Sequence, residues 1–447
     1  MRDAAVTIVR RLQQAGHEAG WVGGCVRDML LGLGPKDYDV ATSARPEAVE
    51  ALFPHTIPVG RQFGVMLVVQ GRRTFEVATF RTEGDYRDGR RPGRVEFADA
   101  RADMQRRDFT INGLFYDPVC ERLFDWVGGE ADLRARCLRT IGEPRERLAE
   151  DHLRLLRAVR FATQLDFSIE PGTWQAVRSM AGAIRGIAEE RIREELRRLF
   201  VPPHAGRGLV LLEQSGLLAE VLPELQATVN CEQSPEYHPE GTVFQHLVRM
   251  LELLPMDAPP LLPWAVLLHD VGKPRTAVRA EPLGRIRFHE HERVGAEMAR
   301  TILERLRFPR RWIEEVVACV RYHMQFKDAP RMRKATRRRM MLRPTFGLEL
   351  ALHRLDCLGS HGDLGIYQLL QTEREALCNQ PALQPPMLRG QDLIALGLAP
   401  GPRFTTILRE AHERQLQDEI RTPDEARAWA AQWLEIKRES DPIRRKP

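Results

Sequence analysis

The spacing of apolar residues changes near residue 145 of this chain. Before that point, apolar or alternating stretches such as "AGWVGGCV", "YDVAT", "GVMLVVQ" and "TFEVATF" are typical of strands, with helical segments between them. After it, stretches such as "EDHLRLLRAVRFATQL" and "AGRGLVLLEQSGLLAEVL" carry apolar residues at helical spacing, and strand patterns nearly vanish. The pattern predicts an α+β fold with a small mixed head and a larger helical remainder.

A chain of 447 residues is too long for one hydrophobic core, so several domains are expected. We predict a head over 1–145, a helical neck over 146–235, a helical body over 236–378 and a helical tail over 379–447. The tail begins with the proline-rich "NQPALQPPMLRG", which is typical of a linker.

The stretch "KDYDVAT" in the head contains two aspartates, Asp37 and Asp39, in what the pattern predicts as a short strand. Side chains two apart on a strand share a face, so these carboxylates would lie roughly 6–7 Å apart. Like charges at this distance repel each other. A solvated turn after Gly34 and Pro35 would explain them, but a divalent cation held between them is the functional alternative. Two carboxylates together with substrate phosphates are how Mg²⁺ is usually bound.

A phosphate-binding turn is predicted directly before the aspartates, in "GGCVRDMLLG". Gly23 and Gly24 let the backbone approach a ligand closely, and a helix that starts there offers free N–H groups to phosphate. Arg27 in this helix adds further donors. Later in the head, Arg107 stands beside Asp108 in "RRDFT", where it could form a surface ion pair or reach a triphosphate.

The stretch "EDHLRLLR" opens the first neck helix in this prediction and places Asp151, Arg154 and Arg157 at i, i+3 spacing on one face. An exposed ladder of ion pairs is the structural explanation. In the functional explanation, a carboxylate accepts a hydrogen bond from an exocyclic amine of a base, while an arginine donates a hydrogen bond to a ring nitrogen of the same base. Cytosine and adenine both present that pattern, so the pair would select C and A without a nucleic-acid template.

Composition and charge narrow the class of protein only a little. The net charge is +5, and "RMRKATRRRMMLR" (331–343) and the terminal "IRRKP" concentrate basic residues that suit either a solvated helix face or a phosphate backbone. Seven scattered cysteines without a C-x-x-C pair suit a reducing, cytoplasmic environment. The sequence has no stretch of 18 apolar residues, and its N-terminal segment is charged throughout, so we expect neither a membrane span nor a signal peptide.

Several motifs, in order, resemble those of class II tRNA nucleotidyltransferases (CCA-adding enzymes) and bacterial poly(A) polymerases. They are "GGCVRDMLLG…KDYDVAT", "RRDFTINGLFYD", "FDWVGGEADL", "EDHLRLLRAVRFA" and "ERIREEL", between about residues 20 and 225. The resemblance implies a polymerase-β-like head with a mixed sheet and Mg²⁺ on catalytic Asp37 and Asp39. It also implies nucleotide contacts, which fall on Gly24, Arg27, Arg107, Asp151, Arg154 and Arg157.

The choice within this family rests on two segments. Poly(A) polymerases carry a stretch similar to V-G-R-R-F-x-L-x-H, where this chain has "VGRQFGVMLV", with Gln62 and Leu67 at the differing positions. CC-only enzymes lack a flexible loop that this chain fills with "EGDYRDGRRPGR" (83–94). We therefore expect complete CCA addition to tRNA from CTP and ATP, with poly(A) synthesis or A-only addition as the alternatives.

The body carries a second set of candidate ligands, which begins with adjacent His269 and Asp270 in "LLHDVGKP". Imidazole and carboxylate ligands together suit a divalent transition metal. The order resembles the HD phosphohydrolase superfamily, which implies metal-dependent hydrolysis of a phosphoester or, alternatively, a degenerate scaffold. The six ligands that we predict are His246, His269, Asp270, His291, His323 and Asp356. Asp363 competes with Asp356 for the last position, and His238 and His289 are expected to be bystanders.

Two functions of other classes remain as alternatives at this point. The chain could be primarily an HD phosphohydrolase whose head senses nucleotides, or an RNA-binding protein without catalysis. The paired aspartates argue against both, because nothing structural requires them. The tail and the basic run at 331–343 are expected to contact tRNA.

Overall fold

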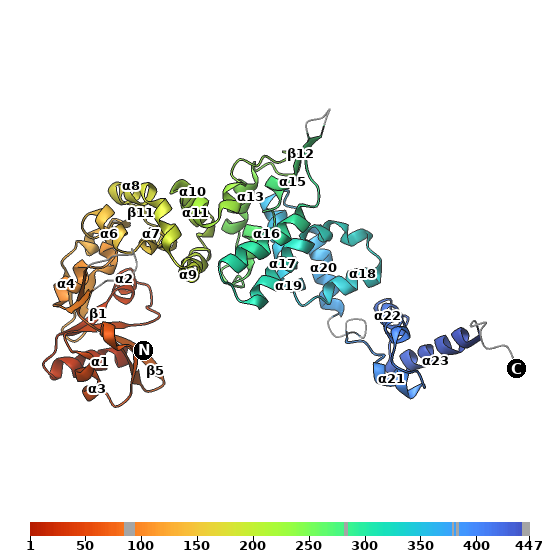
Figure 1. The fold of residues 1–447 in the computed structure, drawn as a ribbon, viewed down its shortest axis with the longest axis horizontal. Coiled ribbons are helices and arrows are strands. Elements are labelled where there is room, and N and C mark those ends of the chain that lie inside the picture. Colours follow the sequence, from red (N-terminus) through yellow and green to blue (C-terminus); the bar gives the residue numbers. More distant parts are fainter. Residues whose placement is uncertain (85–93, 281–284, 378–379, 381–383, 440–447) are drawn as a thin grey trace. The chain divides into compact units, whose positions relative to one another are not determined.

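The computed structural model describes residues 1–84, 94–280, 285–377, 380 and 384–439. The chain divides into two compact units (Figure 1). The first unit is Met1–Val229 together with Leu254–Met256 and Ile302–Phe308, and the second comprises Asn230–Leu253, Asp257–Thr301 and Pro309–Pro447.

A seven-stranded sheet in the order β3-β4-β5-β2-β1-β8-β9 forms the centre of the head. The β2–β5 pair is parallel and the other neighbours are antiparallel, so the sheet is mixed. Its strands are β1 (Ala19–Val22), β2 (Asp39–Thr42), β3 (Thr56–Gly60), β4 (Val65–Gln70), β5 (Arg73–Thr79), β8 (Leu114–Asp117) and β9 (Arg122–Asp125).

The head's helices are α1 (Arg2–Gln14), α2 (Gly24–Leu30), α3 (Pro46–Leu52), α4 (Ala100–Gln105) and α5 (Gly129–Arg134), with the 3-10 turns η1 (Arg61–Phe63) and η2 (Thr110–Asn112). The neck contains α6 (Pro144–Glu150), α7 (Leu153–Gln164), α8 (Pro171–Ser179), η3 (Ala181–Gly186), α9 (Glu189–Leu199), α10 (Ala205–Gln214), α11 (Leu217–Val221) and α12 (Pro223–Gln226). The short strands β10 (Cys137–Leu138) and β11 (Ser168–Ile169) pair in parallel beside it.

The helices that follow residue 230 are α13 (Val243–Glu252), α14 (Leu262–Leu268), α15 (Lys273–Thr276), α16 (His291–Arg305), α17 (Arg310–Tyr322), η4 (His323–Arg331), α18 (Lys334–Met341), α19 (Phe346–Gly359), α20 (Gly365–Leu377), α21 (Gly390–Ala395), α22 (Pro402–Leu416) and α23 (Pro423–Glu439). A hairpin of β12 (Ala277–Ala280) and β13 (Arg285–Phe288) interrupts this helical part. The apolar pattern had not indicated that hairpin.

Two local predictions differ from the structure. Strand β2 begins at Asp39, so Asp37 lies exposed in the turn before it, because Gly34 and Pro35 delay the extended segment. Asp151 lies between α6 and α7, not inside one helix. Its carboxylate accepts a hydrogen bond from the N–H of Leu153 (3.1 Å), which satisfies an N-terminal donor of α7.

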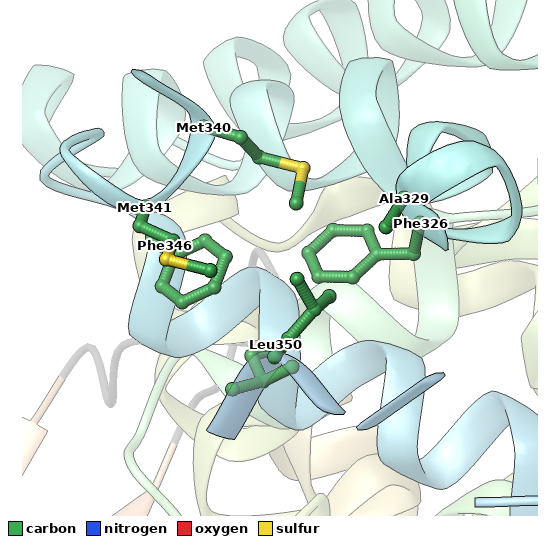
Figure 2. Close-up of a cluster of buried hydrophobic side chains, with 7 residues drawn as sticks. Phe326, Ala329, Met340, Met341, Phe346 and Leu350 are labelled. Atoms are coloured by element: carbon green, nitrogen blue, oxygen red, sulfur yellow. The ribbon is translucent and has the colours of Figure 1, made fainter. Parts of the chain in front are cut away.

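A hydrophobic cluster fixes two elements of the second unit that carry predicted ligands. Phe326 and Ala329 of η4 pack with Met340 and Met341 of α18 and with residues of α19 and α20 (Figure 2). The ring of Phe326 also stacks on the imidazole of His353 in α19, with centroids 4.9 Å apart. Because η4 starts at His323 and α19 contains Asp356, this packing sets where both side chains emerge.

The predicted fold class, an α+β head with a mixed sheet followed by helical modules, is confirmed. The two ends of the arginine-rich loop pair as β6 (Arg81–Gly84) and β7 (Arg94–Phe97), while residues 85–93 lie outside the described residues. The terminal "IRRKP" lies outside them as well. Among the described segments, no helix is both long and apolar enough to cross a membrane.

Candidate functional sites

Three carboxylates crowd together at the edge of β2 in the head. Burial and, to a smaller extent, the charges of Glu76 and Asp37 together raise the pKa of Asp39 to about 6, against the opposing effect of Arg107. Glu76 stands on β5, the parallel neighbour of β2. A hard divalent cation would relieve this repulsion, and carboxylate oxygens are the ligands that Mg²⁺ prefers. Asp37 and Asp39 therefore fit the predicted magnesium site, and Glu76 is a neighbour that the sequence analysis did not single out.

The glycine turn before α2 lies against Arg107. Gly23 has φ +71°, in the left-handed region that favours glycine. A Cβ at Gly23 would lie 3.0 Å from an Nη of Arg107, so a larger residue would press on that guanidinium. Arg107 does not pair with its neighbour Asp108; its Nη2 lies 3.2 Å from Asp103. The turn and Arg107 thus form one local surface.

Hydrogen bonds connect two predicted nucleotide-binding arginines, one on the head and one on the neck. Arg27 of α2 donates to Oδ1 of Asn112 at 2.8 Å. The amide nitrogen of Asn112 donates to Asp108 at 3.0 Å, and Nε of Arg157 in α7 donates to the other oxygen of Asp108 at 2.7 Å. Burial alone would raise the pKa of Asp108, but Arg157 and Asn112 outweigh burial and lower it to about 2.

The predicted base-reading residues are each paired with another partner. Asp151 accepts from Arg191 of α9 at 2.7 and 3.3 Å. The largely buried Arg154 pairs with Glu150 and donates to the carbonyl oxygen of Arg147 at 2.7 Å. Asp151 lies just before α7 and Arg154 lies in its first turn, and the ion pairs described for them are with Arg191 and Glu150.

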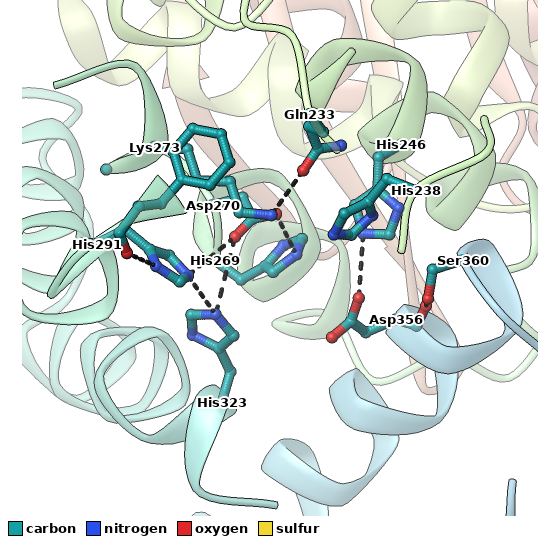
Figure 3. A network of polar contacts seen from close by, with 12 residues as sticks. Gln233, His238, His246, His269, Asp270, Lys273, His291, His323, Asp356 and Ser360 are labelled. Carbon is teal, nitrogen blue, oxygen red and sulfur yellow. Dashed lines mark hydrogen bonds and ion pairs between the residues drawn. The ribbon is translucent and has the colours of Figure 1, made fainter. Parts of the chain in front are cut away.

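All six predicted ligands in the second unit converge on one cluster (Figure 3). Their ligand atoms fall into two groups, His246–His269–Asp356 and Asp270–His291–His323, and within each group they lie within 4.8 Å of one another. Asp270 lies between the groups, because one of its oxygens is 3.2 Å from Nε2 of His269 and the other is 3.4 Å from Nε2 of His291. The sequence order of these residues therefore becomes one three-dimensional site.

Backbone carbonyl oxygens orient three of these histidines. Nδ1 of His269, His291 and His323 lies 2.7–2.9 Å from the carbonyl oxygens of Val266, Phe288 and Val320, three residues earlier in each case. A carbonyl oxygen can only accept, so each Nδ1 carries a proton, and in the neutral ring Nε2 is then the nitrogen with the lone pair. The three lone pairs face the carboxylate of Asp270.

This arrangement fits a bound cation better than it fits the protein alone. Nε2 of His291 and Nε2 of His323 lie 3.2 Å apart, and burial lowers the pKa of His323 to about 3, so that ring stays neutral. Two lone pairs at this distance repel unless a cation lies between them. Ligand atoms that share one ion at about 2.1 Å lie roughly 3–4 Å apart, which matches the observed spacing.

His246 completes the cluster with a carboxylate on each side. Its Nε2 lies 3.1 Å from Asp356 and its Nδ1 lies 2.6 Å from Glu240. Burial lowers the pKa of His246, but Asp356 and Glu240 outweigh burial and raise it to about 9. Both ring nitrogens and Nε2 of His269 are buried without a hydrogen bond of normal geometry among the described residues. Because Nδ1 of His246 faces Glu240, Nε2 of His246 and Nε2 of His269 are the nitrogens that a metal ion would satisfy.

Glu240 is the partner that sequence reasoning missed, although it stands six residues before His246 in "HPEGTVFQH". The competing candidates lie elsewhere: Asp363 accepts from the N–H of Gly365 (2.8 Å), and His289 is exposed. His238 touches Glu240 at 2.9 Å, beside the cluster. A cavity of about 550 Å³ opens onto Asp270, His291, His323 and Asp356, and Lys273, Arg287 and Lys327 add positive charge to its wall.

Most basic residues of the run at 331–343 are ion-paired within the second unit. Five of its seven basic residues form ion pairs: Lys334 and Arg338 with Asp418, Arg337 with Glu373, Arg339 with Glu413, and Arg343 with Glu349. These pairs link α18 and the residue Arg343 that follows it to α19, α20, α22 and the segment after α22. The run therefore has a structural role, and because these pairs set four carboxylates against its seven basic residues, it keeps an excess of positive charge.

Comparison with known proteins identifies three segments. The sequence model of the "Poly A polymerase head domain" matches residues 20–139. That of the "Probable RNA and SrmB- binding site of polymerase A" matches 166–228, and that of the "HD domain" matches 242–351. The fold and the two sites thus define a nucleotidyltransferase joined to an HD domain.

Relatives extend this similarity over the whole chain. The A-adding tRNA nucleotidyltransferase of Deinococcus radiodurans is 39% identical over 93% of this chain and 96% of its own length. The CC-adding tRNA nucleotidyltransferase of Thermus thermophilus is 36% identical over 92% and 93%. The crystal structure of the Bacillus stearothermophilus CCA-adding enzyme in complex with CTP superposes with a TM-score of 0.76, at 26% identity and 98% coverage of both chains. The chain belongs to the class II tRNA nucleotidyltransferase family, which confirms the resemblance of its motifs.

Proposed function

We propose that the chain adds C and A nucleotides to the 3′ end of tRNA from CTP and ATP, and so builds the complete CCA end. The observation that carries this proposal is the crowded carboxylate site of Asp37 and Asp39 beside the linked arginines of head and neck. Family membership and full-length relatives that act on tRNA support it.

The catalytic roles follow from the charges of these side chains. Asp37 and Asp39 would hold Mg²⁺ through their carboxylate oxygens. When bound, Mg²⁺ supplies Lewis acidity and balances the charge of the leaving pyrophosphate. The amides at Gly24 and the guanidinium groups of Arg27 and Arg107 bind the triphosphate.

Base selection is assigned to Asp151 and Arg154, with Arg157 beside them. A carboxylate offers about four acceptor positions, of which Asp151 uses three, for Leu153 and for two donors of Arg191. Arg154 has five donors and uses three of them on its described partners. Each side chain therefore keeps hydrogen-bonding capacity for the amine and ring nitrogen that C and A share. Replacing Arg154 by Ala should raise UTP incorporation relative to CTP; an unchanged ratio would refute this role.

A-only addition is the second candidate, and the Deinococcus radiodurans relative favours it. The decisive experiment offers tRNA transcripts that end before the CCA, after the first C and after the second C, with CTP, ATP or both. CCA addition predicts that every transcript is completed with both nucleotides. A-only addition predicts extension of the CC-ended transcript alone, and CC-only addition predicts that the same transcript is never extended. Poly(A) synthesis would appear as long tracts made with ATP alone.

A second activity, metal-dependent hydrolysis of a phosphoester, is proposed for the HD cluster. A divalent transition metal held by the six ligands would supply Lewis acidity and lower the pKa of a water molecule. His269→Ala should abolish hydrolysis of phosphomonoester and cyclic phosphodiester substrates while nucleotide addition is retained. Loss of both activities would instead mean that the cluster is a structural element.

The remaining modules have supporting roles in this proposal. The neck (146–235) reads the base, the body (236–378) carries the HD site, and the tail (379–447) contacts tRNA. Phosphate contacts release counterions, so the tRNA affinity of the full chain should fall steeply with salt. If a chain truncated after residue 378 binds tRNA as tightly as the full chain does, the tail does not contact tRNA.

A further inference from the structure

One aromatic ring lies under three guanidinium groups in the first unit. Phe161 of α7 is buried, with 7% of its surface exposed. The guanidinium carbons of Arg27, Arg157 and Arg160 lie 5.2, 5.1 and 4.0 Å from its centroid. A cation within about 6 Å of a ring face is attracted by the ring's quadrupole, so all three contacts are favourable.

The three arginines differ in what else holds them. Arg160 forms a buried ion pair with Glu195 at 2.5 Å, which makes it a structural partner of the ring. Arg27 is fastened by Asp28 and Asn112. Arg157 is fastened by Asp108. The last two are the arginines predicted to bind the nucleotide.

Arg27 is bonded through Nε and Nη2 to Asp28 and through Nη1 to Asn112, and Arg157 is bonded through Nε and Nη2 to Asp108. These bonds act at the rim of each guanidinium, so its flat face can still tilt. A ring face beneath the group removes this freedom, because the attraction depends on how the cation sits over the π surface. Phe161 does so for an arginine of the head and an arginine of the neck at once. Its ring also packs edge-to-face on Phe109 of the head, with centroids 5.8 Å apart. The same ring therefore supports arginines from two parts of the candidate nucleotide site.

We infer that Phe161 is a positioning residue for the nucleotide, because its ring holds Arg27 and Arg157 in the orientations in which they meet the incoming triphosphate and base. The inference rests on the proposed nucleotide-binding roles of these two arginines. It predicts that the π face matters and not only the apolar volume.

The test compares Phe161→Leu with Phe167→Leu in the full chain. Phe167 is also a buried neck phenylalanine, and it carries one arginine, Arg136, at 5.6 Å, away from the candidate site. Loss of the two contacts at Phe161 should raise KM for both ATP and CTP about fivefold, with kcat changed less than twofold. Phe161→Tyr, which keeps the ring, should retain the KM of the original protein. Thermal unfolding should show a similar loss of stability for both Leu variants.

The variant Arg27→Ala distinguishes a failure of this inference from a failure of the proposed nucleotide-binding role of Arg27. Arg27→Ala should raise KM at least as much as Phe161→Leu does. If Arg27→Ala raises KM and Phe161→Leu changes it no more than Phe167→Leu does, the inference is overturned and the role of Arg27 stands. If Arg27→Ala leaves KM unchanged, both are overturned. Should Phe161→Leu fail to fold, Phe161→Met removes the π face with a smaller change of packing, and the same readings apply.

Discussion

The two candidate cation sites of this chain are built in opposite ways. In the head, Asp37 is exposed, Asp39 is half-buried, and the charges that act on Asp39 are the carboxylates of Glu76 and Asp37 and the guanidinium of Arg107. In the HD cluster, Asp270 and four histidines are buried, and each histidine is fixed through Nδ1 by a carbonyl oxygen or by Glu240. The predicted ligands of the head site are two carboxylates, whereas those of the HD cluster are four imidazoles and two carboxylates that lie together.

This difference concerns when the cation binds. A few hard oxygen ligands hold Mg²⁺ weakly until substrate phosphates complete the coordination. Buried imidazoles with preset tautomers have already lost their freedom on folding, so a transition metal can bind without substrate. Under the proposed function, the head site would share its cation with the nucleotide, whereas the HD cluster would bind a metal with ligands of the folded chain alone.

The largest expected effect is on nucleotide addition and comes from a substitution that disrupts the head site alone. Asp39→Asn keeps the size of the side chain but removes its charge, so nucleotide addition should fall by roughly 10³-fold or more. The affinity for tRNA and the metal content of the HD cluster should stay unchanged. Single-turnover incorporation with truncated tRNA measures nucleotide addition, and filter binding measures the affinity for tRNA. Turnover near that of the unaltered chain would contradict the assigned role of Asp39.

The next effect breaks the HD cluster alone. His291→Ala removes one ligand and should weaken retention of a transition metal at least about 100-fold, with nucleotide addition intact. His289→Ala is the matched control, because that imidazole is exposed two residues away. Elemental analysis after dialysis against a chelator provides the measurement. Equal metal content in both variants would argue that the cluster binds no metal.

A smaller effect concerns the support of the head's arginines. The pKa of Asp108 is about 2 in the folded chain, below its unfolded value near 3.9, so ionised Asp108 stabilises the fold by roughly 2 kcal/mol. Because the folded pKa is the lower one, this stability is fully present above about pH 4 and is lost as the pH falls towards 2. Asp108→Asn should therefore lower the free energy of unfolding at pH 7, and the gap should narrow between pH 4 and 2. Urea unfolding at several pH values measures it; a gap that does not change with pH would contradict this explanation.

The smallest expected effect concerns Glu240, which contacts a predicted ligand of the HD cluster without being a predicted ligand itself. Glu240→Gln removes the negative charge that contacts Nδ1 of His246. It should lower metal affinity about tenfold, as loss of such partners typically does. Glu232→Gln changes an exposed carboxylate of the same loop and should have no effect. Metal titration followed by calorimetry distinguishes them. If the two variants bind metal equally well, Glu240 does not orient His246.

Ordered motifs and runs of charge differ in how much they indicate about the folded chain. The six HD residues are far apart in the chain, yet their order alone indicated the cluster that the structure forms. The basic run at 331–343 indicated an RNA surface, but its partners Asp418, Glu373 and Glu413 come from segments 30 or more residues away. A charge run reports which groups are present, and only folding decides which of them are neutralised.

Two carboxylates escaped notice for the same reason. Glu76 occupies an ordinary alternating strand and affects Asp39 only because β5 lies in parallel beside β2. Glu240 follows a proline in a loop and meets His246 only after α13 has formed. Neither residue lies in a recognisable ligand spacing, so local pattern carried no signal for them.

By itself, the amino-acid sequence determined the α+β head, the helical modules and the family, because apolar periodicity and ordered motifs are local properties of the chain. Tertiary structure alone decided which partners hold Asp151, Arg154 and Arg157, and that one phenyl ring serves arginines of both head and neck. Those facts depend on side chains that are distant in sequence and meet only when the segments pack, and the energies of ion pairs and ring contacts are set by that meeting.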